Sequence, residues 1–291
     1  MSDIAAARRW FAEELRYVAR VRSTAVVAAF ASVPREHFAG PGPWRLLSPS
    51  YMRGYWTTED AEPRNLYHDV LIAIDESRGL NNGQPSLWAY LYDQIGLATG
   101  DHVVHIGIGT GYYTAILADI VGRDGQVTAV EIDAELAERA RMNLATGWPQ
   151  AQVITTDGFA FRPERPADVI VVNAGVTHLS LLWLDALAEN NGRLLVPLTG
   201  ANRWGAFVLI TRQPGEPVRY AARYVSQVGI IDCVGGRNSE AEERLSLALR
   251  RSQGAVPVQS LRRPPEEPDD TCWLAGDGWW LSMAPVPPGD P

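Results

Sequence analysis

The chain has 291 residues, of which 46% are hydrophobic and 21% charged, a composition typical of a folded globular protein. Its formal net charge of -8 argues against a nucleic-acid partner, because phosphate backbones attract basic surfaces. No apolar run approaches the roughly 18 residues that span a bilayer, and the N-terminal residues lack the apolar core of a secretory signal. We therefore expect a cytoplasmic protein with no membrane partner, present as a monomer or weak oligomer.

The first part of the chain is predicted to contain helices and loops. Apolar residues recur at helical spacing over residues 4–22, and a second helix is predicted over 24–31, ending before Pro34. The sequence VPREHF (33–38) is expected to be an irregular link. Residues 40–65 are rich in proline, glycine and aromatic residues without a period, which predicts either a substrate lid or a loop pinned by its aromatic side chains.

Amide side chains precede the first glycine-rich motif. The sequence YHDVLIAI (67–74) predicts a short strand, and RGLNNGQPS (78–86) predicts a turn. Pro85 can open a helix because its missing N–H would have no helical partner there. The Asn-Asn-Gly turn is therefore expected directly before a helix N-terminus.

The stretch from His102 to Asp133 is typical of a βαβ unit that binds a nucleotide-like cofactor. A short apolar strand is followed by a turn and by a helix predicted over residues 112–121. The turn has three glycines at G-x-G-x-G spacing, Gly107, Gly109 and Gly111. Glycine lets a ligand approach the backbone and the free N–H groups of the helix N-terminus. An ordinary tight turn is the alternative.

Glu131 completes this unit. A strand is predicted over residues 127–130, and Glu131 stands just past its end, twenty residues after Gly111. An acidic residue at about this spacing binds ribose hydroxyls in nucleotide-binding βαβ units. The glycine spacing lacks the last positions of the dinucleotide pattern, and it is the form found in methyltransferases that use S-adenosylmethionine (SAM), which has no pyrophosphate.

Further strands and helices alternate after Glu131, which predicts an α/β, doubly wound, Rossmann-like sheet. Ligands bind such sheets at the carboxyl ends of the strands. Strands predicted over 152–155 and 167–172 end at two polar sites, Asp157-Gly158 and Asn173. Asp157 is a candidate acceptor for an adenine amino group, although Asp-Gly is also a common plain turn.

The C-terminal part has fewer signals. Ser239 and Glu242 are predicted to form a capping box at the start of a helix. Residues 253–270 are expected to be an exposed linker, and the aromatic residues of 269–283 a packed hairpin or, alternatively, a peptide-binding platform. The two cysteines form no C-x-x-C pair, and we expect no metal site. The chain is thus expected to have three parts: an N-terminal helical and loop region (1–75), a SAM-binding methyltransferase domain (76–235) and a C-terminal extension (236–291).

The order and spacing of seven sequence blocks resemble the protein-L-isoaspartate O-methyltransferase family over residues 20–235. These blocks are VVAAFASVPREHF, YHDVLIAI, GLNNGQPS, HIGIGTGYYTAILA, VTAVEID, TTDG and GRLLVPL. The resemblance implies a SAM-dependent methyltransferase fold and methylation of the free carboxylate of isoaspartyl residues in damaged proteins. Related enzymes esterify an aspartyl or C-terminal carboxylate during peptide natural-product synthesis.

The resemblance also implies roles for individual residues. Gln84 ends a segment that lies over cofactor and substrate in the family, and Gly83 stands where the family has a substrate-contacting serine. His105 stands where the family has an acid before the first glycine. We predict that Asn82 and Gly83 position the substrate. The predicted cofactor-binding residues are Gln84, His105, Gly107, Gly109, Gly111, Glu131, Ile132, Asp157, Gly158 and Asn173.

The chemistry of a carboxylate acceptor fits the residues present. A carboxylate is ionised near neutral pH, so its methylation needs alignment and no general base. The first hypothesis is therefore a SAM-dependent O-methyltransferase whose partner is a protein or peptide with a free carboxylate. The alternatives are a small-molecule or N-methyltransferase, for which His105 and His178 are candidate bases, and a SAM-binding protein without turnover.

Overall fold

The computed structural model describes residues 3–50 and 53–287. The chain divides into two compact units. Unit 1 comprises Met1–Asp101 and Ile108–Thr155, and unit 2 comprises His102–Gly107 and Thr156–Pro291. The chain therefore passes from unit 2 to unit 1 inside the glycine-rich turn. The division into residues 1–75, 76–235 and 236–291 stays a prediction.

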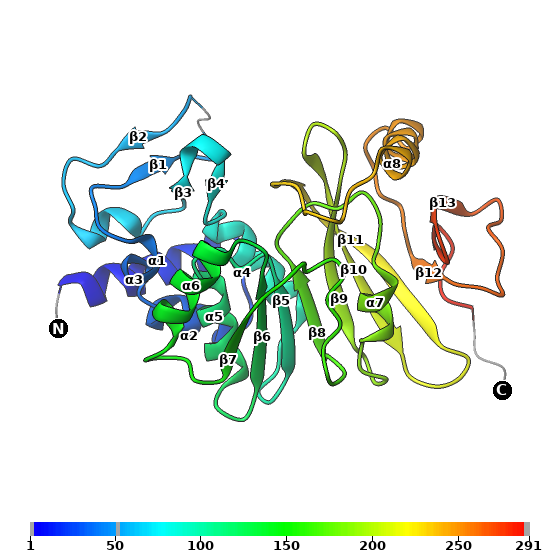
Figure 1. The fold of residues 1–291 in the computed structure, drawn as a ribbon, viewed down its shortest axis with the longest axis horizontal. Coiled ribbons are helices and arrows are strands. Elements are labelled where there is room, and N and C mark those ends of the chain that lie inside the picture. The colour runs from blue at the N-terminus through cyan, green and yellow to red at the C-terminus, as the bar shows by residue number, and fades with distance from the viewer. Residues whose placement is uncertain (1–2, 51–52, 288–291) are drawn as a thin grey trace. The chain divides into compact units, whose positions relative to one another are not determined.

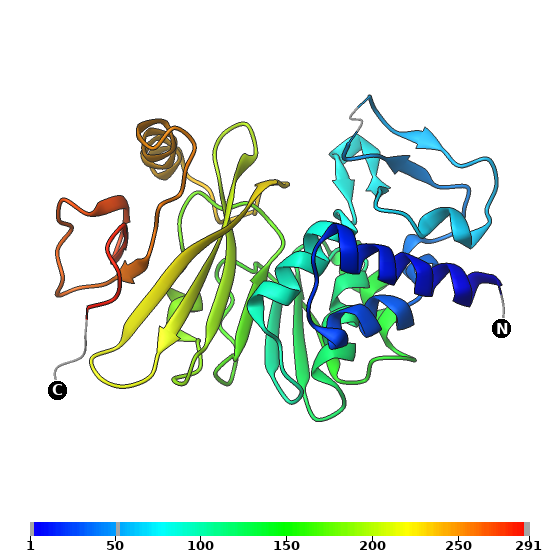
Figure 2. The same cartoon turned by 180° about the vertical axis from the view of Figure 1, so that it is seen from behind.

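Unit 1 contains six α-helices among its described residues, and Figures 1 and 2 show α1 and α2 side by side. Buried aromatic rings join these helices to the rest of the unit; the rings of Phe11 and Phe30, for example, meet edge to face with centroids 6.4 Å apart. The helices are α1 (Asp3–Val18), α2 (Thr24–Ser32), α3 (Arg35–Ala39), α4 (Pro85–Ile95), α5 (Tyr112–Val121) and α6 (Ala134–Leu144).

The predicted irregular link over residues 33–38 is wrong, because these residues include α3. The predicted end of the second helix before Pro34 is confirmed, since α2 ends at Ser32, and Pro34 also stands at the N-cap of α3. Arg35 is fully buried and donates hydrogen bonds to the carbonyl groups of Leu66, His68 and Val70. A buried guanidinium thus ties the start of α3 to the chain that leads into the next strand.

Unit 1 also has a four-stranded antiparallel sheet, visible in Figure 1 at the blue and cyan end of the colour scale. The loop predicted over residues 40–65 contains two short strands among the residues described, which the sequence pattern does not predict. The sheet order is β2 (Trp56–Thr57), β1 (Arg45–Leu47), β3 (Leu71–Asp75) and β4 (Leu80–Asn81). Two 3-10 turns, η1 (Pro63–Leu66) and η2 (Glu76–Arg78), join these strands to their neighbours.

The two remaining strands of unit 1 pair in parallel. They are β6 (Gln126–Glu131) and β7 (Ala151–Thr155), and α6 connects them. Asp133 caps α6 through its carboxylate, which accepts the backbone N–H groups of Glu135 and Leu136, a role typical of an acidic residue directly before a helix.

Unit 2 is a mixed sheet. Its strands β5 (His102–Ile106), β8 (Val169–Val172) and β9 (Arg193–Thr199) pair in parallel and are almost completely buried. The antiparallel strands follow in the order β10 (Trp204–Gln213), β11 (Arg219–Gly229), β12 (Ser260–Arg262), β14 (Trp279–Ser282) and β13 (Cys272–Gly276). The α/β class is confirmed, with an antiparallel half that strand–helix alternation does not predict.

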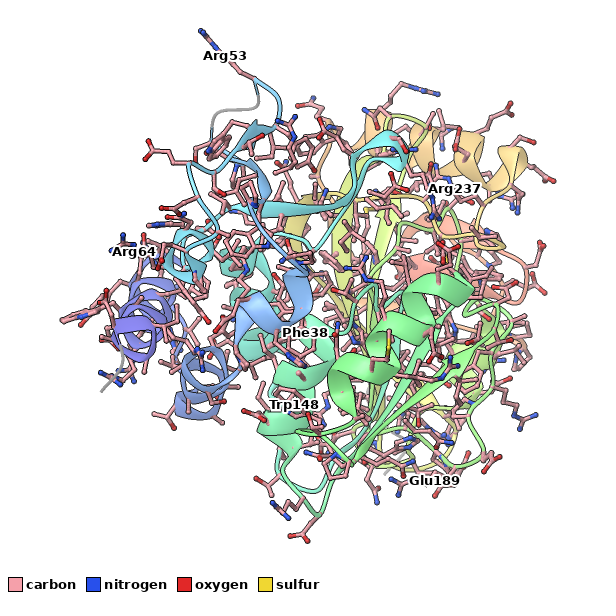
Figure 3. All side chains as sticks on the ribbon, turned by 60° about the vertical axis from the view of Figure 1, so that its left-hand side comes forward. Phe38, Arg53, Arg64, Trp148, Glu189 and Arg237 are labelled. Atoms are coloured by element: carbon pink, nitrogen blue, oxygen red, sulfur yellow. The ribbon has the colours of Figure 1, made fainter. Side chains whose placement is uncertain are left out.

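The C-terminal segment continues the sheet of unit 2. The predicted hairpin over 269–283 is present as β13 and β14, but the predicted linker contains β12. The helices of unit 2 are α7 (Leu181–Asp185) and α8 (Ser239–Arg251). The predicted capping box is wrong: Asn238 caps α8 by accepting the N–H of Ala241, and Glu242 binds Arg237, labelled in Figure 3, at 2.7 Å.

No helix within the described ranges is long and apolar enough to cross a membrane. The same ranges contain no group of three or more His, Cys, Asp or Glu side chains arranged to hold a metal ion.

Candidate functional site

The glycine loop of unit 1 (Ile108–Gly111) is bound to Glu131, the last residue of β6. The N–H of Gly109 donates to one oxygen of the Glu131 carboxylate at 2.8 Å. The other oxygen accepts the N–H groups of Ile132 and Asp133 at 3.0 and 3.1 Å. A carboxylate has about four acceptor positions. Glu131 therefore holds the loop and keeps acceptor capacity for a ligand.

Burial sets the acidity of Glu131. The side chain is buried, and the loss of hydration raises its pKa, while the three backbone N–H groups act in the opposite direction. Ile132, by contrast, is 44% exposed at the tip beyond the strand. The strand end thus places an acidic acceptor and an accessible apolar side chain next to each other.

In the Asn81–Pro85 segment, the side-chain oxygens of the two asparagines already accept hydrogen bonds from backbone N–H groups. The Oδ1 atom of Asn81 accepts the N–H of Gly83 at 2.9 Å. The Oδ1 atom of Asn82 accepts the N–H of Ile72 at 2.9 Å, which extends the strand pairing of β3. The N–H of Gly83 is therefore not available to a substrate, although the NH2 group of Asn82 has no partner among the described residues.

Gly83 stands where no side chain fits. Its φ is +77°, and an added Cβ would lie 2.5 Å from Nε1 of Trp88. The Trp88 ring is buried and packs against Tyr92 and Tyr113, with centroids 5.7 and 5.4 Å away, so it has no free space to move into. The hydroxyl of Tyr113 also donates to the Gly83 carbonyl at 3.1 Å. Trp88 therefore imposes glycine at position 83.

Asp69, which the sequence did not single out, organises the start of α4. Its carboxylate accepts the N–H and the hydroxyl of Ser86 at 2.8 and 2.7 Å. It also accepts from the amide of Gln84 at 2.9 Å. Gln84 is thus hydrogen-bonded inside unit 1. The signal for Asp69 is weak in the sequence, because the residue lies 17 positions before its partner Ser86.

In unit 2, His105 and Asn173 meet at the ends of two paired strands. His105 is fully buried in β5, next to the side chain of Asn173, which follows β8. Burial lowers the pKa of His105 to about 4, so the ring is neutral at pH 7. The Oδ1 atom of Asn173 is buried and accepts no hydrogen bond from a described residue.

The Asp157–Gly158 turn of unit 2 packs closely on β5. A Cβ at Gly158 would lie 2.4 Å from the Ile106 side chain, so only glycine allows this approach. One oxygen of Asp157 accepts the N–H of Phe159 at 2.9 Å, which closes the turn. The carbonyl of Gly158 accepts from the Trp183 indole at 3.0 Å. Gly107, also in unit 2, has a φ of +77° directly after β5.

Comparison with known proteins gives consistent relatives. A family model described as "Protein-L-isoaspartate(D-aspartate) O-methyltransferase" matches residues 50–233. The protein-L-isoaspartate O-methyltransferase of Thermotoga maritima is 33% identical over 264 residues, covering 86% of this chain and 77% of that protein. That of Gloeobacter violaceus is 32% identical over 210 residues, covering 70% of this chain and 90% of that protein.

Solved structures show the same fold. A protein-L-isoaspartate O-methyltransferase structure aligns with a TM-score of 0.60 and 23% identity, covering 93% of this chain and 87% of its own. A Plasmodium falciparum candidate for the same enzyme, solved with S-adenosyl-L-homocysteine, has a TM-score of 0.58 and 18% identity, covering 78% of this chain and 97% of its own.

Proposed function

Because the chain belongs to the protein-L-isoaspartate(D-aspartate) O-methyltransferase family and is a SAM-dependent methyltransferase, we propose that it esterifies the free carboxylate of an isoaspartyl residue in a protein or peptide. The observation that carries the proposal is the glycine loop held by Glu131. The names of the curated relatives support isoaspartate as the first substrate to test.

The residues present fit SAM. In unit 1, we assign the ribose hydroxyls to Glu131, whose buried carboxylate keeps acceptor capacity, and we place Gly109, Gly111 and Ile132 next to the cofactor. In unit 2, the buried and unsatisfied Oδ1 of Asn173 is an acceptor suited to a ligand donor. We assign the remaining cofactor contacts of unit 2 to His105, Gly107, Asp157 and Gly158. Gln84 acts indirectly, through its bond to Asp69.

SAM supplies a methyl group on a positively charged sulfur, and the chain's own residues need only bind and align the acceptor. A carboxylate carries its negative charge at pH 7, so no residue has to remove a proton. Alignment of this kind accounts for about 7–11 kcal/mol of a barrier. Asn82 is our candidate for positioning, through the NH2 group that the backbone leaves unused. At Gly83, Trp88 fills the space beside the backbone, so a substrate could contact only the main chain of this residue.

The glycine at position 83 suggests a second candidate for the carboxylate that accepts the methyl group. Trp88 excludes the serine that the family places at this position, so the contact of that serine with isoaspartate is missing. This difference favours the carboxylate of an aspartyl residue or of a peptide C-terminus as the second candidate substrate.

The test uses matched peptides and SAM with a labelled methyl group. One peptide carries isoaspartate, the second aspartate, and the third the carboxamide of isoaspartate. We expect label on the isoaspartyl peptide that base treatment releases as methanol, and none on the carboxamide. Label on the aspartyl peptide alone would support the second candidate, whereas base-stable label would exclude carboxyl methylation.

A further inference from the structure

A small cavity of about 40 Å³ lies beside the glycine loop of unit 1. A buried water needs roughly 10–15 Å³ of such space, so the cavity has room for a group of a few atoms. Its walls come from α3, where Figure 3 labels Phe38, and from β3, the Asn81–Pro85 segment, the glycine loop and α6. The lining residues used below are Phe38, Ile72, Ile74, Asn82, Thr110 and Arg139.

Among the described residues that line this cavity, Arg139 alone is ionisable. It is half-buried on α6, and its guanidinium makes no hydrogen bond or ion pair with any residue in the described ranges. Its neighbour Arg141, by comparison, pairs with Glu138 at 3.1 Å. A partly desolvated cation without a counter-charge is costly, which favours an anionic ligand at this point.

Asn82 adds a neutral donor to the same cavity. Its Oδ1 atom accepts the Ile72 N–H, so the NH2 group is the part of the amide that remains for a ligand. Phe38, Ile72 and Ile74 supply apolar walls, and hydrogen bonds strengthen where water is excluded. A guanidinium and an amide NH2 against apolar walls form a donor set suited to a carboxylate.

We propose that Arg139 and Asn82 form the subsite that binds the acceptor carboxylate of the substrate, next to Thr110 of the glycine loop. This inference rests on the proposed function. The ion pair engages one carboxylate oxygen and leaves the other to attack. In the transfer, a C–O bond forms at that oxygen and the S–CH3 bond of SAM breaks, with its electron pair remaining on sulfur. No proton moves, and the positive and negative charges cancel.

The test compares Arg139→Gln with Arg123→Gln, which removes the same charge from an exposed turn. For the isoaspartyl peptide, we expect Arg139→Gln to raise KM by about 10- to 100-fold, as for the loss of one charge-assisted pair. The Kd for SAM should stay unchanged, and the Tm should not fall, because Arg139 has no partner among the described residues. Arg139→Lys should recover part of the affinity. Arg123→Gln should behave as wild type.

Two results would overturn the subsite. One is a KM for Arg139→Gln equal to that of the wild type. The other is a weaker Kd for SAM with an unchanged peptide KM, which would assign Arg139 to the carboxylate of the cofactor. In a binding assay, Arg139→Gln could also raise the Kd of the isoaspartyl peptide and the Kd of its carboxamide by the same factor. That result would contradict recognition of the carboxylate charge.

A titration with acetate separates this inference from the proposed function. The guanidinium NMR signals of Arg139 should shift with millimolar acetate in the wild type, and the shifting signals should be missing in Arg139→Gln. If acetate shifts these signals but the wild type does not methylate the isoaspartyl peptide, the subsite stands and the substrate assignment fails. If methylation occurs and acetate shifts nothing, the subsite fails alone.

Discussion

The glycine loop and the Asn81–Pro85 segment, both in unit 1, use their polar groups in opposite ways. In the loop, the Gly109 N–H donates to the Glu131 carboxylate, which retains acceptor capacity. In the segment, the Oδ1 atoms of Asn81 and Asn82 accept backbone N–H groups of the protein itself. A charged side chain at a strand end therefore predicts a ligand-binding site better than an amide side chain does. Amide side chains readily form hydrogen bonds with nearby backbone groups of the protein itself.

Removing the charge of Glu131 tests whether the carboxylate that holds the glycine loop also binds SAM, and it has the largest expected effect of the changes proposed. Glu131→Gln should weaken SAM binding on the order of 1,000-fold, about 4 kcal/mol, if two ribose hydrogen bonds to a charged acceptor contribute about 2 kcal/mol each. Calorimetry with SAM measures the change. Glu135→Gln, at an exposed position in the first turn of α6, is the control. Affinity within tenfold of the wild type would remove Glu131 from the cofactor site.

The buried His105 offers a test by pH. Its folded-state pKa of about 4 lies below the ordinary value of 6.5, so the fold favours the neutral ring. That stability is present above pH 6.5 and is lost as the pH falls toward 4. Between pH 7 and pH 4, the wild type should lose about 3 kcal/mol more unfolding free energy than His105→Gln.

Urea unfolding at both pH values measures this difference, and His68→Gln, at an exposed histidine, is the control. Parallel loss of stability in the wild type and His105→Gln would mean that the ring is protonated inside the fold. His105 would then be unsuited to the neutral contact proposed here.

Gly83→Ala tests the packing of the Asn81–Pro85 segment against Trp88. The new Cβ meets Trp88, so the variant should lose about 2 kcal/mol more unfolding free energy than Gly100→Ala. Gly100 is a matched control, since its φ is +89° and nothing lies within 4 Å of an added Cβ. The double variant Gly83→Ala/Trp88→Phe should recover part of the loss. Equal stability of the two alanine variants would show that Trp88 moves aside without cost.

Asp69→Asn has the smallest expected effect. The carboxylate caps α4 and holds Gln84, so its loss should lower the unfolding free energy by about 1 kcal/mol and raise the peptide KM a few-fold. Denaturation and steady-state kinetics measure both quantities. Asp124→Asn, at an exposed position without a partner among the described residues, should leave both values unchanged. An unchanged KM would separate the cap from substrate positioning.

The features that could be predicted from the sequence depend on short stretches of chain. The glycine loop, the helix over 112–121 and the cap at Asp133 follow from residues a few positions apart. Glu131 was placed correctly at a strand end because the spacing of a βαβ unit is set by the length of one helix.

The features that could not be predicted depend on distant partners. The sequence indicates a helix stop at Pro34, and the short helix that begins directly after it has no local signal of its own, although proline is favoured at the start of a helix. The strands β1 and β2 have two or three residues, too few for a period. Arg139 carries no local signal, because Glu135, Glu138 and Arg141 also put charges on α6 and the cavity is formed by segments up to about a hundred residues away.

The contact between Gly83 and Trp88 also constrains the order in which this sequence can change. A single substitution at position 83 introduces a side chain into space that the indole already fills. A lineage could therefore regain a side chain there only after Trp88 had been replaced by a smaller residue. Because the residue at position 88 limits what position 83 can hold, the two positions must be considered together when substrates of relatives are compared.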